Sequence, residues 1–373
     1  MGEWSNAPTV LSATIFALGW CAGWVGFVRA RRLPAASSLP RTDGVATKRS
    51  PVSVVIPCRD EANNLAELLP NLCSVLQADD QVIVVDDGSS DDTTSVARNH
   101  RAGRNIANEI NIEVVESGAL PIGWAGKPHA CWRGVQYAIH DIVVFLDADV
   151  RLGTDAVNAT VGALQQHPDA LVSVMPWHCT VTRVERLSML FNVISSMVAS
   201  VTTARSRRRV AYGPFMMVNR ATYVQSGGHS HQLVRGAVVE DLALARIMPA
   251  AMPLVGRQHE VEYRMYANGF KQLIEGWTKN TAIGAATVPR WSSVLIIAWV
   301  ASLCGGVLTS PWFYVLSALQ MFVFARRVGN FGVLSAVLYP IHAVMFVVVA
   351  LRSAARVVLF GSVTWRGRRI NTR

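Results

Sequence analysis

The sequence is poor in charged residues and has no closely spaced cysteine pairs. Charged residues make up 16% of the 373 positions, whereas 51% are hydrophobic. The mean hydropathy of +0.28 is high for a soluble enzyme and low for a protein built only of membrane spans. The six cysteines include no Cys-x-x-Cys spacing, which argues against a zinc site or a disulfide framework and fits a reducing cytoplasm. We therefore expect a soluble domain joined to membrane segments.

Acidic residues are also scarce, since 25 of them face 35 basic residues and leave a net charge of +10. Such a balance can indicate nucleic-acid binding, but no groove-reading motif and no interleaving of aromatic and basic residues is present. The basic residues instead cluster beside apolar spans, where they can attract anionic lipid headgroups. The charge predicts membrane lipids as partners and no nucleic acid.

The first apolar run has no basic residues before it. Residues 10–28 are long enough to span a bilayer, and Arg29, Arg31 and Arg32 follow them, whereas a signal peptide carries its positive charge in front. We predict an N-terminal transmembrane anchor over residues 1–32, with the N-terminus outside and the chain after it in the cytoplasm. Residues 33–50, rich in Pro, Ser, Thr and basic side chains, are predicted to be a linker.

Residues 51–285 read as a cytoplasmic domain in which strands and helices alternate. Apolar runs predict four strands, at residues 52–56, 81–85, 112–115 and 142–146. Residues 63–76 have helical periodicity, and Asp91 or Asp92 can cap the helix that follows the second strand. This alternation predicts an α/β fold with a doubly wound, mostly parallel sheet.

Carboxylates follow two of these strands. Asp86 and Asp87 end the second, and Asp147 and Asp149 come directly after the buried run 142–146. The carboxyl ends of parallel strands lie at one edge of the sheet, which is where open α/β sheets place ligands. Mg²⁺ is commonly shared between carboxylates and substrate phosphates. We interpret this edge as a metal–diphosphate site, although either pair alone could be a solvated turn.

Two further segments are candidates for the same site. In residues 121–130 the glycines allow close backbone approach to a ligand, and Lys127 offers a positive charge beside a diphosphate. The alternative is an ordinary surface loop with a solvated lysine. Glu240 and Asp241 stand where a helix begins, where they can compensate the helix dipole, serve as catalytic carboxylates, or do both.

Residues 187–204 are apolar but contain several polar residues, and an arginine run that includes Arg207, Arg208 and Arg209 follows. A transmembrane helix here would separate the predicted site residues across the bilayer. We therefore expect a buried helix or an amphipathic helix resting on anionic lipid.

The C-terminal region 286–360 contains apolar runs at residues 291–308, 312–325 and 333–351, and a basic tail over 361–373 follows. Arg326 and Arg327 suit a cytoplasmic turn, and the tail should also be cytoplasmic. Three crossings from a cytoplasmic start would leave the tail outside. Either one segment is re-entrant or interfacial, with Pro340 as a break, or the rule fails here. The protein is thus predicted to be a multi-pass cell-membrane protein with two to three C-terminal membrane helices.

These motifs resemble those of the family 2 glycosyltransferases of the GT-A fold. The resemblance rests on DDGSSDDT after the second strand, on DAD after the fourth, on the later ED and on the membrane segments. Within that family, GWAGKPHAC, YGPFMMVNR with GGH, RMYANGF with EGWTKN, RRVGNF and WRGR are similar to motifs of bacterial glycosyltransferases of carotenoid synthesis. The resemblance extends from Val52 to the tail.

The resemblance implies an inverting transfer of a hexose, glucose, from a nucleotide sugar such as UDP-glucose. The acceptor it implies is an apolar lipid, a carotenoid acid such as 4,4'-diaponeurosporenoate, and the cofactor is Mg²⁺ or Mn²⁺. Asp60 departs from the asparagine that many relatives have at this place. By position, the implied metal ligands are Asp147 and Asp149, the implied catalytic pair is Asp241 with Glu240, and the implied donor-binding residues are Pro57, Glu61, Asp86, Asp87, Lys127, His129, Asp147, Trp277 and Lys279.

Other functions remain open at this point. The acceptor could be a hydroxyl of a polyisoprenoid, hopanoid or ceramide-like lipid, and then Asp241 would have to remove its proton. A carotenoid acid is already ionised at neutral pH, so Asp241 would only position groups or would repel it. A nucleotidyltransferase also pairs carboxylates with a metal and a nucleotide, and a membrane protein without catalysis is a third alternative.

Overall fold

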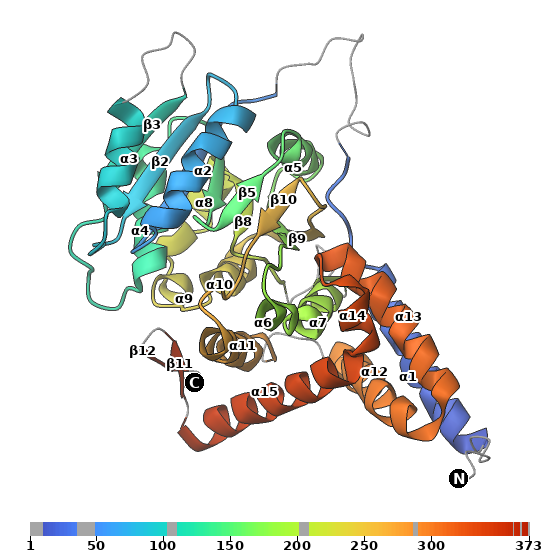
Figure 1. Ribbon diagram of the computed structural model, residues 1–373. Coiled ribbons are helices and arrows are strands. Elements are labelled where there is room, and N and C mark those ends of the chain that lie inside the picture. The colour runs from blue at the N-terminus through green and yellow to red at the C-terminus, as the bar shows by residue number, and fades with distance from the viewer. Residues whose placement is uncertain are drawn as a thin grey trace, which may run out of the picture. The chain divides into compact units, whose positions relative to one another are not determined.

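The computed structural model describes residues 10–35, 49–102, 110–200, 209–285, 290–360, 362–365 and 368–371. The chain divides into two compact units (Figure 1). The sheet unit contains Arg31–Trp177 and Thr202–Tyr263, and the helical unit contains Met1–Ala30, His178–Val201 and Arg264–Arg373.

The sheet unit is built on seven strands in the order β3-β2-β1-β4-β8-β6-β9. Strands β3, β2, β1 and β4 are parallel to one another, β8 runs antiparallel to both β4 and β6, and β9 is parallel to β6. The predicted mostly parallel α/β sheet of the GT-A type is therefore confirmed. The strands are β1 Val52–Cys58, β2 Gln81–Asp86, β3 Asn111–Glu116, β4 Ile142–Leu146, β6 Ala170–Met175, β8 Phe215–Asn219 and β9 Ala250–Val255.

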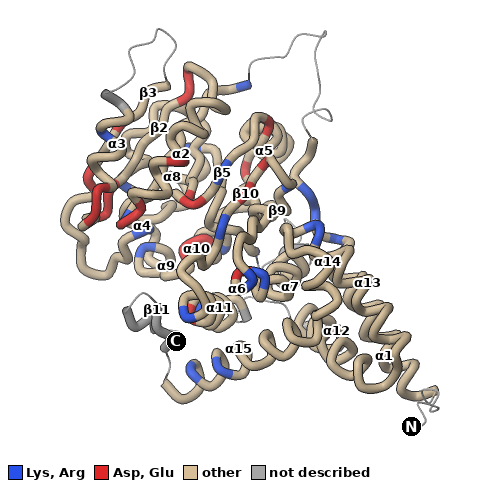
Figure 2. The backbone as a smooth tube through the Cα atoms, in the orientation of Figure 1, with Lys and Arg blue, Asp and Glu red and all other residues tan. Residues whose placement is uncertain are grey.

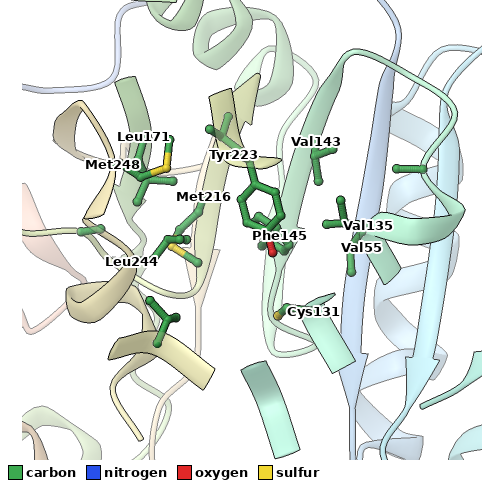
Figure 3. Close-up of a cluster of buried hydrophobic side chains, with 14 of the residues drawn as sticks. Val55, Cys131, Val135, Val143, Phe145, Leu171, Met216, Tyr223, Leu244 and Met248 are labelled. Atoms are coloured by element: carbon green, nitrogen blue, oxygen red, sulfur yellow. The ribbon is translucent and has the colours of Figure 1, made fainter. Parts of the chain in front are cut away.

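The central strands are buried because helices cover the sheet. Every residue of β2 and β4 is buried, as expected of continuous apolar runs in a parallel sheet. Helix α4 packs on β1 and β2, and a Cβ at its Gly134 would overlap the side chain of Val55. Figure 3 shows this core, in which Val55, Phe145 and Tyr223 from different elements lie close together. The helices of the unit are α2 Ala62–Val75, α3 Thr93–Ala102, α4 Gly126–Tyr137, α5 Ala156–Gln166, α8 Arg220–Gln225, α9 Gln232–Arg235 and α10 Glu240–Ile247, with a 3-10 turn at Gly228–Ser230.

A second, smaller sheet lies beside the strand ends. In it β5 Val150–Leu152, which follows β4 after one turn, pairs antiparallel with β10 Val261–Tyr263. The short strand β7 Trp177–His178 completes this sheet.

The ends of the predicted linker make defined contacts. Leu33 is buried, and its N–H donates to the Val255 carbonyl oxygen at 2.9 Å. Arg49 donates to Asp80 Oδ1 at 2.7 Å, and Asp80 is itself buried. Residues 36–48 of that linker lie outside the described residues.

Among its described residues, the helical unit contains three helices that are long and apolar enough to cross a membrane, over Val10–Val28, Trp291–Thr309 and Tyr339–Phe360. The predicted run 333–351 is divided between two helices, because α14 ends at Val337 and α15 begins at Tyr339, next to Pro340. The elements of this unit are α1 Val10–Val28, α6 Arg183–Arg186, α7 Met189–Ser200, α11 Phe270–Ala285, α12 Arg290–Thr309, α13 Pro311–Val328, α14 Gly332–Val337, α15 Tyr339–Phe360, β11 Ser362–Trp365 and β12 Arg368–Asn371.

Within the described residues, the segment 187–204 shows no helix of transmembrane length. Helix α7 is described over 12 residues, fewer than the about 20 that a bilayer requires, and Met189, Phe191 and Val193 are buried. The following residues 201–208, which include Arg207 and Arg208, lie outside the described residues. Arg209 donates to the Met248 carbonyl oxygen.

Residues 178–201 and 264–285 belong to the helical unit, whereas the predicted domain limits grouped them with the sheet. Aromatic packing explains the grouping, since Phe191 of α7 stacks on Trp277 of α11 and also contacts Phe346 of α15. Periodicity indicated these helices, but it does not indicate their packing partners.

Candidate active site

The loops after β1 and β2 are held together by side-chain hydrogen bonds. Asp60, at a φ of 53°, accepts from the Ser90 N–H at 2.7 Å. Asp91 accepts from the N–H groups of Ala62 at 3.1 Å and Thr93 at 3.0 Å, so one carboxylate caps both α2 and α3. The prediction that Asp91 or Asp92 caps the second helix is confirmed for Asp91. Burial acts to raise the pKa of Asp91, but hydrogen bonds from the Thr93 hydroxyl and from these N–H groups outweigh it, and the pKa is lowered.

Asp86 and Asp87 lie side by side at the end of β2. Asp86 is buried and accepts from the Ser89 N–H at 3.2 Å. Asp87 accepts from the Ser117 hydroxyl at 3.2 Å, after β3, and lies 3.9 Å from Arg59. Three strand ends therefore meet around this pair.

The glycines before and at the start of α4 allow a turn and a close contact within the protein. Gly123 has a φ of +84° and so makes a turn that favours glycine. Gly126 lies against Asp87, and a Cβ there would overlap Asp87 Oδ2. The sequence predicts that these glycines allow close backbone approach to a ligand, and at Gly126 the neighbour in the structure is a site carboxylate.

Lys127, in the first turn of α4, joins two distant parts of the chain. Its Nζ lies 2.7 Å from Asp147 Oδ1, after β4, and 2.8 Å from Glu240 Oε1, at the start of α10. Burial acts to lower the pKa of Lys127, but the two carboxylates raise it well above its usual value. Lys127 is therefore a fixed positive charge and not a solvated surface lysine.

The second aspartate after β4 is not neutralised in the same way. Burial, followed by repulsion from Asp147 and Glu61, raises the pKa of Asp149 to about 7. The main-chain turn that presents it is closed by the Val150 N–H, which donates to the Asp147 carbonyl oxygen at 3.2 Å. Negative charge is thus in excess at this strand end.

The two carboxylates of α10 have opposite pKa shifts. Burial acts to raise the pKa of Glu240, but Lys127 outweighs it and the pKa is lowered. Burial and then repulsion from Glu240 raise the pKa of Asp241 to about 7. Asp241 accepts from the Gly213 N–H at 2.7 Å and the Leu242 N–H at 2.8 Å. Two neighbouring carboxylates with separated pKa values are an arrangement suited to acid–base work.

The remaining predicted residues of the sheet unit lie at the same strand ends. Pro57 is the penultimate residue of β1 and pairs with Val85. Glu61 accepts from Asn64 Nδ2 at 2.6 Å. His129 is buried in α4 with its ring against Trp124, and burial lowers its pKa although Asp87 opposes this.

Trp277 and Lys279 belong to the helical unit. Trp277 is buried, and its Nε1–H donates to the Ser188 hydroxyl at 3.0 Å while its ring stacks on Phe191. These contacts are those of a core residue of α7, α11 and α15.

His229 was missed as a site residue, although it lies in the GGH motif. It is buried, its N–H donates to the Tyr223 hydroxyl at 2.9 Å, and its Nδ1 lies 2.8 Å from the same oxygen. Since that oxygen accepts the N–H, its proton can go to Nδ1. Burial lowers the pKa of His229 to about 4 although Glu240 opposes this. His229 is therefore a neutral imidazole that is electrostatically coupled to Glu240 of the acidic pair.

Among the described residues, no three His, Cys, Asp or Glu side chains gather closely enough to hold a metal ion by themselves. Two neighbouring carboxylates nevertheless fit a hard divalent cation whose remaining ligands are water and diphosphate oxygens. Asp147 and Asp149 are such a pair: Asp147 shares Lys127 with Glu240, and burial and then repulsion from Asp147 raise the pKa of Asp149. Together with Lys127, this edge of the sheet is able to bind an anionic group and to stabilise charge that develops on it.

Comparisons with known proteins agree with this geometry. A family model described as glycosyl transferase family 2 matches residues 53–223. The chain is 30% identical over 342 residues to a 4,4'-diaponeurosporenoate glycosyltransferase of Staphylococcus haemolyticus, covering 86% of this chain and 88% of that protein. It is also 30% identical to the protein of the same name from Staphylococcus aureus strain MRSA252, covering 85% and 87%.

Among solved structures, a mannosyltransferase of Pyrobaculum calidifontis in complex with GDP-Man and Mn²⁺ has a similar fold. The TM-score is 0.53 at 17% identity, and the match covers 92% of this chain and 99% of the other.

Proposed function

Because the chain belongs to glycosyl transferase family 2, we propose that it transfers glucose from UDP-glucose to a carotenoid acid in the membrane, with inversion at the anomeric carbon. The observation that carries this proposal is Lys127, which draws Asp147 and Glu240 to within 2.8 Å of one ammonium group. A donor site and an acidic pair thereby meet at one point.

The donor would bind along the ends of β1, β2 and β4. Pro57, Glu61, Asp86, Asp87 and His129 lie there and are our proposed donor-binding residues. Asp147 and Asp149 would hold Mg²⁺ or Mn²⁺, which when bound would neutralise charge on the leaving diphosphate. Lys127 is already fixed beside Asp147 and would add a second positive charge there. Trp277 and Lys279, which belong to the helical unit, remain donor-binding residues of this proposal on the resemblance alone.

The reaction would be one displacement at the anomeric carbon. An acceptor oxygen attacks and forms the new C–O bond, while the bond to the diphosphate breaks and its electron pair leaves with UDP. A carboxylate acceptor has no proton to lose. Asp241, with a pKa of about 7, is then able to remain neutral beside it and to avoid repelling it. Glu240 would stay ionised and keep Lys127 in place.

The choice of acceptor is supported by the names of the two relatives, which act on 4,4'-diaponeurosporenoate. An apolar acceptor also suits a chain with three helices apolar enough to cross a membrane, and the basic residues after α1 favour a cytoplasmic catalytic unit. A hydroxyl lipid is the second candidate, because a carboxylate whose pKa is about 7 is well matched to a general base at neutral pH.

The test is transfer by the purified full chain in detergent, given a panel of sugar nucleotides with Mg²⁺ or Mn²⁺. A C30 carotenoid acid and a hydroxyl lipid are offered separately, and mass spectrometry identifies the lipid that gains a hexose. We expect glucosyl ester and free UDP. Pyrophosphate as the product would instead indicate a nucleotidyltransferase, and no transfer from any donor would overturn the proposal.

A further inference from the structure

Helices α1, α12 and α13 lie side by side in the helical unit (Figure 1). Phe16 stacks on Phe313 with centroids 4.1 Å apart, and eleven residues later Phe27 stacks on Phe324 at 4.0 Å. Helices α1 and α13 are therefore parallel. A Cβ at Gly306 of α12 would meet Phe16, whereas a Cβ at Gly23 would meet Trp299. Since the later residue of α1 contacts the earlier residue of α12, α12 runs in the opposite direction.

Because α1 and α13 are parallel, their basic ends meet. The guanidinium of Arg327, in the last turn of α13, lies 5.6 Å from the ring centroid of Phe27, near the end of α1. If α1 crosses the membrane, then α13 must cross with it. The polar residue that lowers the hydropathy of α13 does not prevent this, because Gln320 is buried between Trp299 and the Trp20 carbonyl oxygen, with hydrogen bonds of 2.8 Å to each.

Helix α15 has a different partner. Its middle residue Val349 is buried in a cluster with Leu273 and Trp277 of α11, and Ser353 donates to the Thr278 carbonyl oxygen at 3.0 Å. Helix α11 carries three charged residues, Lys271, Glu275 and Lys279. A bilayer crossing by α15 would bring this stretch of α11 to the depth of the hydrocarbon, where charged side chains are costly.

The other face of α15 is an apolar stripe. Ile341, Val344, Val348, Leu351 and Val358 follow at spacings of three, four, three and seven residues and are between 54% and 71% exposed. Arg352 and Arg356 lie in the second half of this helix, where Figure 2 shows basic positions. An apolar stripe with arginines at its edge is the pattern of a helix that lies in a lipid headgroup region.

We propose that α15 lies along the surface of an anionic bilayer and does not cross it, whereas α1, α12 and α13 cross. Its stripe faces the acyl chains, and Arg352 and Arg356 reach lipid phosphates through their flexible stems. The basic ends of α1 and α13 and the basic C-terminal tail then lie on one side of the membrane. This arrangement removes the conflict between three crossings and a basic tail.

Cysteine labelling tests the crossings in the full chain in membranes. Thr309→Cys marks the end of α12, Arg326→Cys marks the end of α13, and a cysteine added after Arg373 marks the tail. Each is labelled by a membrane-impermeant maleimide in spheroplasts and in inverted vesicles, over the background of the unsubstituted chain. We expect Thr309→Cys on one side and the other two on the opposite side. The proposal would be overturned if Arg326→Cys were labelled from the same side as Thr309→Cys, or from the side opposite to the tail cysteine.

The depth of α15 is a second, independent measurement. Spin labels at V344C, V348C, L351C and V358C are compared for oxygen and nickel accessibility in nanodiscs of anionic lipid. An interfacial helix gives a similar, shallow depth at all four, whereas a crossing helix is deepest at Val348 and Leu351. In the double variant Arg352→Gln/Arg356→Gln the labels should become more exposed to nickel, while Arg98→Gln, on the sheet unit, should change nothing. The proposal would be wrong if the labels were deepest in the middle of the helix. It would also be wrong if the label depths were the same in the double variant as without the two arginine substitutions.

Discussion

Lys127 is the residue on which the charge balance at the strand ends depends. Replacing it with Gln leaves Asp147 and Glu240 without their common partner and removes a positive charge beside the proposed diphosphate. We expect the transfer rate to fall about 10²–10³-fold, as when one group that stabilises developing charge is removed. The transfer rate should fall less in Lys127→Arg, which keeps the positive charge. Steady-state kinetics check this, with Lys271→Gln, on the exposed start of α11, as the control. Unchanged transfer by Lys127→Gln would contradict the role assigned to it.

Asp241 distinguishes the two candidate acceptors through its pKa of about 7. A hydroxyl acceptor needs the ionised form as base, so its transfer rate should rise with pH through 7. A carboxylate acceptor is repelled by the ionised form, so its rate should fall over the same range. Asp241→Asn should remove both slopes, nearly abolish transfer to the hydroxyl, and weaken transfer to the carboxylate less. Asp141→Asn, an exposed aspartate before β4, is the control. If the transfer rates to the two acceptors had the same pH dependence, and it persisted in Asp241→Asn, Asp241 would not distinguish the acceptors.

Asp149 links stability to pH and to a divalent cation. Its pKa in the folded state is about 7, above the usual value near 3.9. The folded state therefore holds a proton that the unfolded state releases, and stability falls as pH rises from about 4 to about 7. Mn²⁺ with UDP should oppose this, by about 2.7 kcal/mol at 100 times its Kd. Thermal unfolding should show a larger Mn²⁺-induced rise in Tm at pH 8 than at pH 6. The same rise at both pH values, or in Asp149→Asn, would speak against a cation at this carboxylate.

At the scale of elements, the first turn of α4 can lie close to Asp87 because its first residue, Gly126, has no side chain. Alanine has a higher helix propensity than glycine, but at Gly126, the first residue of α4, its Cβ would overlap Asp87 Oδ2. Either Asp87 or the start of α4, with Lys127, must move. We expect little change in Tm but a loss in kcat/KM of about 10²-fold, the scale of a small misplacement in a site. Gln136→Ala, exposed at the far end of α4, is the matched control. Wild-type kinetics in Gly126→Ala would mean that the site tolerates this shift.

The elements themselves were largely predictable, because a strand buried on both faces leaves a continuous apolar run. The run 142–146 coincides with β4, and the aspartates that end it had to meet solvent or a positive charge. Periodicity does not indicate which residues distant along the chain contact one another. Lys127 contacts Glu240 across more than a hundred residues, and His229 is indistinguishable in sequence from a turn residue.

Hydropathy likewise misses what covers a membrane helix. It ranks α15 above α13 as a crossing helix, since it counts Gln320, Arg326 and Arg327 against α13. In the structure Gln320 is satisfied between tryptophans of α1 and α12, and the arginines lie at the helix end. The contacts of α15 with the charged helix α11 have no counterpart in a hydropathy profile.

At the scale of the whole molecule, the net charge of +10 should make transfer depend on lipid charge. Each Lys or Arg near an anionic surface contributes about 1 kcal/mol, within a Debye length of about 8 Å at physiological salt. We expect transfer to a lipid acceptor in nanodiscs to rise with the fraction of anionic lipid and to fall as salt increases, because the chain can then approach the leaflet that holds the acceptor. Hydrolysis of the sugar nucleotide without acceptor, measured in the same nanodiscs, is the control. It uses only the strand-end site and should respond much less. If hydrolysis followed lipid charge as steeply as transfer, the charge would act on the site itself and not on access to the acceptor.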